Sequence, residues 1–161
     1  MSRQVRVAVI GAGIGAAHVE AYCANAALYQ VAVVCDLNAA RAGKVAASAG
    51  AAVETSYDAV LRRDDVELID ICLPPSLHAG AIVQALRAGR HVLCEKPLVG
   101  SLREVERIQQ VAATAGRAVV PVYQYRYGNG LARLRRLIAA RVTGKPLVAS
   151  IETHWNRLPA Y

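Results

Sequence analysis

Short, continuously apolar runs recur along much of the chain, and segments with helical spacing separate them. The runs are rich in β-branched residues, and each is followed by a glycine, a proline or a polar residue, which is typical of buried strands. They are Val5–Ile10, Val31–Cys35, Leu68–Leu73, His91–Cys94 and Ala118–Tyr123, with a shorter strand near Ala51–Val53. Strands that are apolar on both faces and alternate with helices predict a parallel sheet covered on both sides. The expected fold class is therefore α/β, with a doubly wound parallel sheet.

Capping residues and glycines predict where the intervening helices begin and end. Asn38, Ser76 and Ser101 are candidate N-caps, and Ser101 with Glu104 has the spacing of a capping box. Glycines then follow the expected helices at their carboxyl ends. Caps included, the expected helices cover residues 16–25, 38–50, 56–63, 76–88 and 101–115.

The pattern changes after residue 125. Apolar residues between Leu131 and Val142 follow helical spacing, and arginines largely occupy the other faces. Residues Leu147–Trp155 then alternate between apolar and polar, which predicts an amphipathic strand. Such a strand needs neighbours, and an unpaired one favours pairing with another chain. We therefore divide the chain into residues 1–125 and the beginning of a second domain at 126–161, expect it to be cut short there, and leave open a homo-oligomer formed through this strand.

Composition indicates a globular domain, because 55% of the residues are hydrophobic and 19% are charged. The four cysteines are widely spaced without a C-x-x-C motif, so we expect neither a disulfide framework nor a metal site. Arg3 and Arg6 precede an apolar segment that imitates a secretory signal, but its closely spaced glycines fit a strand and turn better. No apolar run has the length of a membrane span. We therefore expect a cytoplasmic protein.

The net charge of +7 is unevenly distributed, at −2 over residues 1–80 and +9 over residues 81–161. Seven cations and no carboxylate lie between Arg117 and Lys145. This stretch fits a solvated helix face, an anion-binding face or a nucleic-acid patch. Nucleic-acid binding would favour lysine as well as arginine, with aromatic residues interleaved. We favour the solvated face and expect no nucleic-acid partner.

A glycine-rich turn, Gly11-Ala-Gly13-Ile14-Gly15-Ala16, directly follows the first strand. Gly11 would allow the tight turn, Gly13 would let the backbone approach a pyrophosphate, and the small Ala16 would permit close packing of helix and strand. Phosphates would then bind at the helix N-terminus. Gly11, Gly13, Ile14 and Gly15 are thus candidate cofactor-binding residues, although a glycine-rich turn without a ligand has the same pattern.

Asp36 ends the second strand, where a carboxylate can accept hydrogen bonds from both adenine-ribose hydroxyls and would repel a 2′-phosphate. Asp36 therefore favours NAD, whereas Arg41 nearby keeps NADP open. The alternative is an acid at a helix N-terminus without a ligand. Methyltransferases also use a Gly-x-Gly-x-Gly turn, but usually with an acidic residue at the position that Val9 occupies here, so this class is disfavoured.

Two further motifs follow strands whose carboxyl ends should face the same crevice. Leu73–His78 begins with a rigid Pro-Pro turn, and His78 falls in the first turn of a helix, where a packing role is the alternative to binding. Glu95–Pro97 follows the next strand. Lys96 is one of three lysines against sixteen arginines, and an ammonium can present a proton to a substrate oxygen. A cis bond before Pro97 would aim Lys96 inward, and the alternative is a surface Glu–Lys pair.

Taken together these motifs resemble the glucose–fructose oxidoreductase / inositol 2-dehydrogenase / MocA family. The segments that carry the resemblance are Gly11-x-Gly13-x-Gly15-x-x-His18, Leu73-Pro-Pro-x-x-His78, Glu95-Lys96-Pro97, Tyr123-Gln-Tyr-Arg-Tyr-Gly-Asn129 and His154-Trp-Asn-Arg157. The resemblance extends over nearly all 161 residues, and Glu-Lys-Pro is its most specific motif. The resemblance implies a Rossmann domain followed by the start of an α+β open-sheet domain.

The resemblance also implies roles for individual residues. Lys96 would be catalytic, lying beside the nicotinamide and hydrogen-bonding the reacting oxygen. Gln124 and Arg126 would contact the substrate. The cofactor would be NAD or NADP, and its contacts would come from Gly11, Gly13, Ile14, Gly15, Asp36, Leu73, Pro74, His78, Glu95, Lys96 and Pro97.

The function that this resemblance implies is hydride transfer to or from a carbinol carbon of a sugar, polyol or similar molecule. Such enzymes are usually more than twice as long, and their second domain supplies most of the substrate pocket. Their glycine turn also often carries one more residue after Gly13. The alternative is therefore a dinucleotide-binding module, or truncated remnant, that is catalytically inactive.

Overall fold

A computed structural model describes residues 3–150, 152 and 154 of the chain. Contacts divide the chain into two compact units, residues 1–123 and 124–161. The sequence pattern predicts a domain boundary after residue 125, and the assignment of the second unit to a substrate domain stays a prediction. Within the described residues, no helix is both long enough and apolar enough to cross a membrane.

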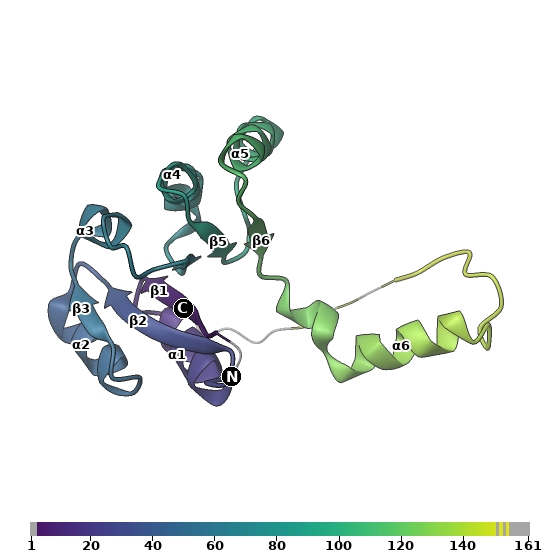
Figure 1. Ribbon diagram of the computed structural model, residues 1–161. Coiled ribbons are helices and arrows are strands. Elements are labelled where there is room, and N and C mark those ends of the chain that lie inside the picture. The colour runs from purple at the N-terminus through teal and green to yellow at the C-terminus, as the bar shows by residue number, and fades with distance from the viewer. Residues whose placement is uncertain (1–2, 151, 153, 155–161) are drawn as a thin grey trace. The chain divides into compact units, whose positions relative to one another are not determined.

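A six-stranded sheet forms the centre of the first unit (Figure 1). Its spatial order is β3-β2-β1-β4-β5-β6, and every neighbouring pair is parallel. The order reverses between β1 and β4, which confirms the predicted doubly wound α/β fold. The strands are β1 Val5–Ile10, β2 Tyr29–Cys35, β3 Ala52–Glu54, β4 Leu68–Ile71, β5 His91–Cys94 and β6 Val119–Pro121.

Helices connect the strands and cover both faces of this sheet, with α1 and α2 on one face and α3, α4 and α5 on the other (Figure 1). This arrangement follows from right-handed crossovers on the two sides of β1. The helices are α1 Gly15–Ala24, α2 Ala39–Ala47, α3 Tyr57–Leu61, α4 Pro75–Arg87 and α5 Leu102–Ala115.

Each face of the sheet has its own hydrophobic core, because successive side chains of a strand point to opposite faces. Val9 of β1 packs with Val19 of α1 on one face, and Ile10 of β1 packs with Ile82 of α4 on the other. Ile82 is fully buried, and burying a side chain of this size contributes about 1.5–3 kcal/mol. The apolar strands of the sequence are thus explained by burial on two sides.

Most of the predicted helix starts agree with the structure, and one does not. The Asn38 side chain accepts a hydrogen bond from the backbone N–H of Arg41, and Ser101 Oγ accepts one from the backbone N–H of Glu104. The prediction that Ser76 caps α4 is wrong, because α4 begins at Pro75. A proline suits the first position of a helix, since its missing N–H would have no intrahelical partner there.

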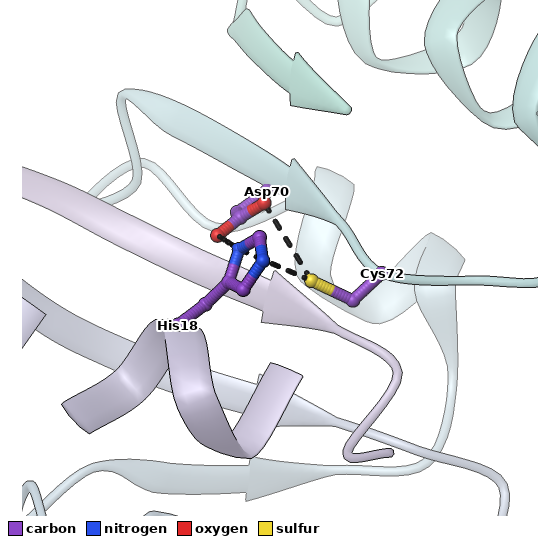
Figure 2. A group of neighbouring side chains, drawn as sticks. All are labelled: His18, Asp70 and Cys72. Atoms are coloured by element: carbon purple, nitrogen blue, oxygen red, sulfur yellow. Dashed lines mark hydrogen bonds and ion pairs between the residues drawn. The ribbon is translucent and has the colours of Figure 1, made fainter. Parts of the chain in front are cut away.

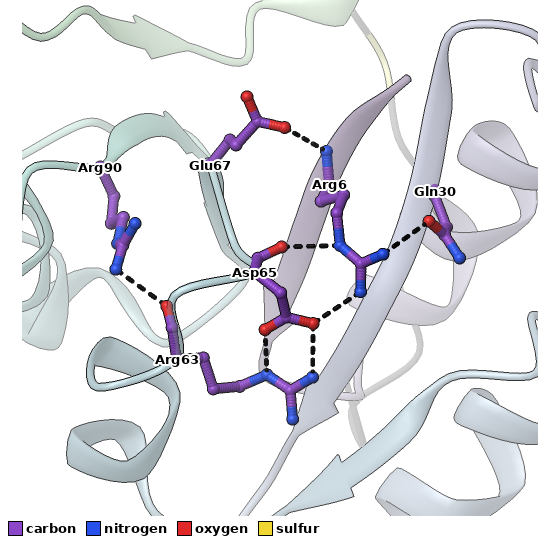
Figure 3. A network of polar contacts seen from close by, with 6 residues as sticks. All are labelled: Arg6, Gln30, Arg63, Asp65, Glu67 and Arg90. Atoms are coloured by element: carbon purple, nitrogen blue, oxygen red, sulfur yellow. Dashed lines mark hydrogen bonds and ion pairs between the residues drawn. The ribbon is translucent and has the colours of Figure 1, made fainter. Parts of the chain in front are cut away.

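A polar network connects the amino ends of several strands, at the end of the sheet opposite to the glycine turn (Figure 3). Arg63 binds the Asp65 carboxylate with two hydrogen bonds of 2.9 and 2.8 Å, and Arg6 Nη2 adds a third of 2.6 Å. These contacts with Arg63 and Arg6 lower the pKa of Asp65. The residues drawn are Arg6, Gln30, Arg63, Asp65, Glu67 and Arg90. The network therefore fixes the register between β1, β2 and the entry to β4.

The second unit contains a short 3-10 helix, η1 (Gln124–Tyr127), and α6 (Asn129–Ala139). The helix predicted between Leu131 and Val142 is thus present with an earlier start and end. Of the strand predicted at Leu147–Trp155, residues 147–150, 152 and 154 show no strand, and the rest lies outside the described residues. A strand is defined by its hydrogen-bonded partner, so an alternating pattern alone does not produce one.

Candidate functional site

The glycine turn lies at the carboxyl end of β1, and its three glycines differ in what surrounds them. Gly11 has a φ of +97°, and a Cβ there would lie 2.5 Å from the backbone oxygen of Cys72. A Cβ on Gly15 would lie 2.8 Å from Val9 Cγ1, so this glycine lets α1 approach β1. A Cβ on Gly13 would meet no atom within 4 Å. Protein packing therefore accounts for Gly11 and Gly15, whereas Gly13 borders open space.

The N-terminus of α1 lies in this turn and is available to an anion. Ile14, at the N-cap position, is 55% exposed and makes no side-chain capping bond, and the first turn holds no acidic residue. Unpaired backbone N–H groups at such an end bind phosphates well, helped by the helix dipole. The surface at Gly13 and Ile14 can therefore accept a pyrophosphate.

Asp36 lies at the end of β2 beside this turn and is 8% exposed. Its Oδ2 accepts a hydrogen bond of 2.8 Å from the backbone N–H of Ala12, and its Oδ1 accepts one of 2.9 Å from that of Asn38. The Arg41 guanidinium binds both oxygens, through Nε at 3.1 Å and Nη2 at 2.8 Å. Burial raises the pKa of Asp36, but these hydrogen bonds outweigh it and lower the pKa overall. Asp36 is therefore held as a carboxylate.

His78 lies in the first turn of α4 and is fully buried. Its Nε2 lies 2.8 Å from the backbone oxygen of Leu73, and its Nδ1 lies 2.9 and 3.2 Å from those of Pro97 and Leu98. His78 therefore joins the turn after β4, which includes the exposed Pro74, to the loop after β5. Direct contact of His78 with a cofactor stays a prediction, and this geometry favours an indirect role.

Glu95, Lys96 and Pro97 follow β5 at the same edge of the sheet. The backbone N–H of Glu95 donates to the backbone oxygen of Ile71, which extends the pairing with β4 beyond the strand ends. The Lys96–Pro97 bond is cis. Lys96 is exposed, and its ammonium makes no hydrogen bond or ion pair within the described residues. Glu95 is 8% exposed, so a buried carboxylate and an exposed ammonium stand next to each other after β5.

The structure also brings together a buried polar cluster that the sequence analysis does not single out (Figure 2). His18 of α1 reaches Asp70 of β4, with Nδ1 at 2.8 Å from Asp70 Oδ2. The Tyr22 hydroxyl donates to the same oxygen at 2.9 Å, and Cys72 Sγ donates to Asp70 Oδ1 at 3.6 Å. Asp70 is fully buried. Its position within the apolar run Leu68–Leu73 is the signal that could have found the cluster, because a buried carboxylate needs partners.

The cluster also has a possible metal-binding composition, since ligand atoms of His18, Asp70 and Cys72 lie within 4.8 Å of one another. Hydrogen bonds among the three side chains account for this closeness. Burial also raises the pKa of the Cys72 thiol far above its usual range, so the thiol can act as the hydrogen-bond donor to Asp70. The donor set is therefore better explained as a hydrogen-bonded cluster.

Gln124 and Arg126 belong to the second unit, on η1, and both side chains are exposed. The Arg126 guanidinium lies 5.4 Å from the ring centroid of Tyr127, within the range of a cation–π contact. Their predicted contact with a substrate stays a prediction.

Comparison with known proteins identifies the first unit. Residues 5–123 match the family described as an oxidoreductase family with an NAD-binding Rossmann fold, GFO_IDH_MocA. Inositol 2-dehydrogenase 2 of Paenarthrobacter aurescens is 33% identical over 150 residues, which are 89% of this chain and 45% of that protein. Inositol 2-dehydrogenase 3 of Saccharopolyspora erythraea is 33% identical over 147 residues, which are 90% and 44%. The chain thus spans less than half the length of these curated relatives.

Solved structures share the fold over a similar extent. GenD2 from gentamicin A biosynthesis, in complex with NAD, superposes with a TM-score of 0.83 at 29% identity, covering 88% of this chain and 41% of that one. KijD10, a 3-ketoreductase from Actinomadura kijaniata in complex with NADP, gives 0.82 at 31%, covering 89% and 46%. The resemblance noted in the sequence is confirmed, and the chain belongs to the GFO_IDH_MocA oxidoreductase family.

Proposed function

We propose that this chain is the cofactor-binding part of an NAD(P)-dependent oxidoreductase that transfers a hydride to or from a carbinol carbon of a polyol or sugar-like molecule. The proposal rests on one observation, which is that the glycine turn, Asp36 and Glu95–Pro97 lie at the same end of the sheet. All follow the carboxyl ends of parallel strands, on both sides of the point where the strand order reverses. Crevices at such points bind dinucleotides. The names of the relatives support the substrate class.

Within this proposal the dinucleotide lies across the carboxyl ends of the strands, from Asp36 to Lys96. The pyrophosphate lies at Gly13, where the surface is open, and the adenine ribose lies at Asp36. The nicotinamide end lies between the turn at Leu73 and Pro74 and the pair Glu95–Lys96. The end of β2 and the end of β5 are three strand spacings apart, about 14 Å, which suits an extended dinucleotide.

The carboxylate of Asp36 favours NAD over NADP, because a lowered pKa keeps it negative and it would repel a 2′-phosphate. Arg41 and Lys44 support the other cofactor. They line a cavity of about 380 Å³ with Ala12, where a 2′-phosphate could meet two cations. To bind an adenine ribose, Asp36 must exchange at least one of its hydrogen bonds to Arg41 for a ribose hydroxyl.

The chemistry assigned to Lys96 follows from its ammonium, which is exposed and has no partner among the residues that the structure describes. A nicotinamide cofactor supplies or accepts the hydride when it is bound. Lys96 donates a hydrogen bond to the reacting oxygen, and passes a proton to it when a carbonyl is reduced. That Gln124 and Arg126 contact the substrate remains part of the proposal. His78 keeps the loop that carries Lys96 attached to the turn after β4.

Cofactor choice is tested by titrating the chain with NADH and NADPH. Wild type should prefer NADH, and Asp36→Ala should weaken NADH binding about tenfold, which is about 1.4 kcal/mol, while NADPH binding is kept or improved. Asp64→Ala is the matched control, since Asp64 is an exposed aspartate outside the site. Unchanged NADH affinity in Asp36→Ala would remove Asp36 from the ribose.

Catalysis is tested separately, by mixing the chain with NAD and myo-inositol or glucose and following NADH formation. Turnover that Lys96→Met abolishes, while NADH binding persists, supports the enzyme. Lys145→Met, in the second unit, is the matched control. If the chain binds NADH but shows no turnover, the alternative holds for this polypeptide, and it is a dinucleotide-binding module.

We also place the protein in the cytoplasm, where three buried thiols, Cys35, Cys72 and Cys94, would remain reduced. Association through residues 147–155 stays a prediction. Light scattering coupled to gel filtration tests it, because a monomer at high concentration contradicts pairing through that segment.

A further inference from the structure

His18 connects two carboxylates that come from different strands. Its Nδ1 lies 2.8 Å from Asp70 Oδ2, and its Nε2 lies 3.2 Å from Glu95 Oε1. The His18 side chain is only 15% exposed, and the carboxylates of Asp70 and Glu95 are 0% and 11% exposed. The imidazole therefore bridges α1, β4 and the segment after β5 inside the protein.

The chemistry of this bridge favours a charged imidazole. An ionised carboxylate only accepts hydrogen bonds, and only an imidazolium donates from both ring nitrogens. The hydroxyl of Tyr22 and the thiol of Cys72 donate to Asp70, and Cys72 Sγ also lies 3.5 Å from His18 Nδ1. The hydrogen bond to Asp70 raises the pKa of His18; burial opposes it, and the contact with Glu95 adds to the rise.

Glu95 is held on both of its oxygens as a result. Oε1 faces His18 Nε2, and Oε2 accepts a hydrogen bond of 3.1 Å from the backbone N–H of Lys96. The orientation of the Glu95 carboxylate is thus set by α1 on one side and by the catalytic candidate on the other. Loss of His18 would free one oxygen of Glu95 and leave the buried Asp70 with two neutral donors.

We propose that His18 is a positioning residue for the nicotinamide end of the site, holding Glu95, and through Glu95 the backbone of Lys96, in the orientation that receives the cofactor. The inference rests on the proposed function, which places Glu95 and Lys96 at that end. His18 itself need not touch the cofactor. Asp70 fixes the imidazole from behind, as carboxylates commonly fix functional histidines.

Two conservative variants separate the halves of the bridge. The amide nitrogen of asparagine occupies nearly the place of Nδ1, so His18→Asn keeps a donor to Asp70 and loses the one to Glu95. The longer glutamine side chain reaches the place of Nε2, so His18→Gln keeps a donor toward Glu95. His91→Asn is the control, because His91 is an exposed histidine at the amino end of β5.

Calorimetric titration with NADH and with ADP-ribose, which lacks the nicotinamide, gives the required readout. His18→Asn should weaken NADH binding about fivefold or more and change ADP-ribose binding less than twofold. His18→Gln should recover most of the NADH affinity. If His18→Asn weakened the binding of NADH and of ADP-ribose equally, or weakened neither, the positioning role would be overturned.

A second measurement tests the inference even if His18→Asn is less stable than wild type. If His18 acts through Glu95, the double variant His18→Asn/Glu95→Gln should bind NADH no more weakly than Glu95→Gln alone. Additive losses overturn the inference. Wild type that binds neither NADH nor ADP-ribose overturns the proposed function as well, whereas wild-type binding with additive losses overturns only the role of His18.

Discussion

Gly11 and Gly13 stand two positions apart in one turn, and the structure predicts opposite consequences for replacing them by alanine. Gly11→Ala places a methyl group 2.5 Å from the Cys72 backbone oxygen, in a backbone with a φ of +97°. Gly13→Ala places the same group in open space, in a backbone without a positive φ. The first change should therefore affect folding, and the second should affect only what binds at the surface.

The magnitude follows from two costs at Gly11. A positive φ costs a non-glycine residue about 1–2 kcal/mol, and an overpacked methyl group against backbone adds about 1–3 kcal/mol. Together these give about 2–5 kcal/mol, a large part of the about 5–15 kcal/mol by which domains are stable. For Gly13→Ala the folded state is unstrained, so stability should hold or rise by about 0.4–1 kcal/mol.

Urea unfolding followed by circular dichroism measures the two stabilities, and NADH titration measures binding. Gly13→Ala should unfold like wild type and bind NADH at least about tenfold more weakly, because a methyl group would stand between the backbone and the pyrophosphate. Gly11→Ala should unfold at a much lower urea concentration. If Gly13→Ala bound NADH with wild-type affinity, the pyrophosphate would not approach Gly13, and equal stabilities for the two variants would refute the steric reasoning.

Three further outcomes follow from the structure. Asp65→Asn should lose about 0.5–1 kcal/mol at neutral pH. Arg63 and Arg6 lower the pKa of Asp65 below 3.8, so the difference in unfolding free energy between wild type and Asp65→Asn should persist above pH 3.8 and vanish as the pH falls through the folded pKa. If urea unfolding gave the same difference at every pH, the ion pairs would not be its cause. Ile82→Ala should lose about 2–5 kcal/mol in the same assay, since Ile82 is fully buried. His78→Ala should speed hydrogen exchange of the Leu98 and Val99 backbone amides in the loop after β5, and exchange equal to wild type would show that the loop is held by other contacts.

Much of the first unit follows from local sequence. β1 and β5 have the predicted bounds, because each is a short apolar run with a glycine or a charged residue directly after it. The Ser101 capping box and Gly116, with a φ of 62°, bound α5 as expected. The predicted N-cap at Ser76 is wrong because a serine before an apolar helical run is typical of an N-cap, whereas here the preceding Pro75 already starts the helix.

The site is predictable only in part, for a physical reason. Its glycines, Asp36 and Glu95–Pro97 are adjacent to strand ends, and strand ends are readable in sequence. The bridge from His18 to Asp70 and Glu95 joins residues far apart in the chain, and only the register of β1, β4 and β5 brings them together. The ion pair between Arg41 and Asp36 is equally hidden, since the sequence alone does not show that the Arg41 side chain folds back onto Asp36.

The reversal of strand order between β1 and β4 divides the sheet into two halves, β3-β2-β1 and β4-β5-β6, whose strands pair with each other only at β1 and β4. Asp36 and the glycine turn belong to the first half, and Glu95 to the second. A bound dinucleotide would therefore act as a further cross-link between the two halves, in addition to the bridge from His18 to Asp70 and Glu95. At a concentration of about 100 times its dissociation constant it would add about 2.7 kcal/mol to any opening that separates them. In hydrogen exchange, the amides of both halves would then slow together, so that the cofactor makes one cooperative unit out of two.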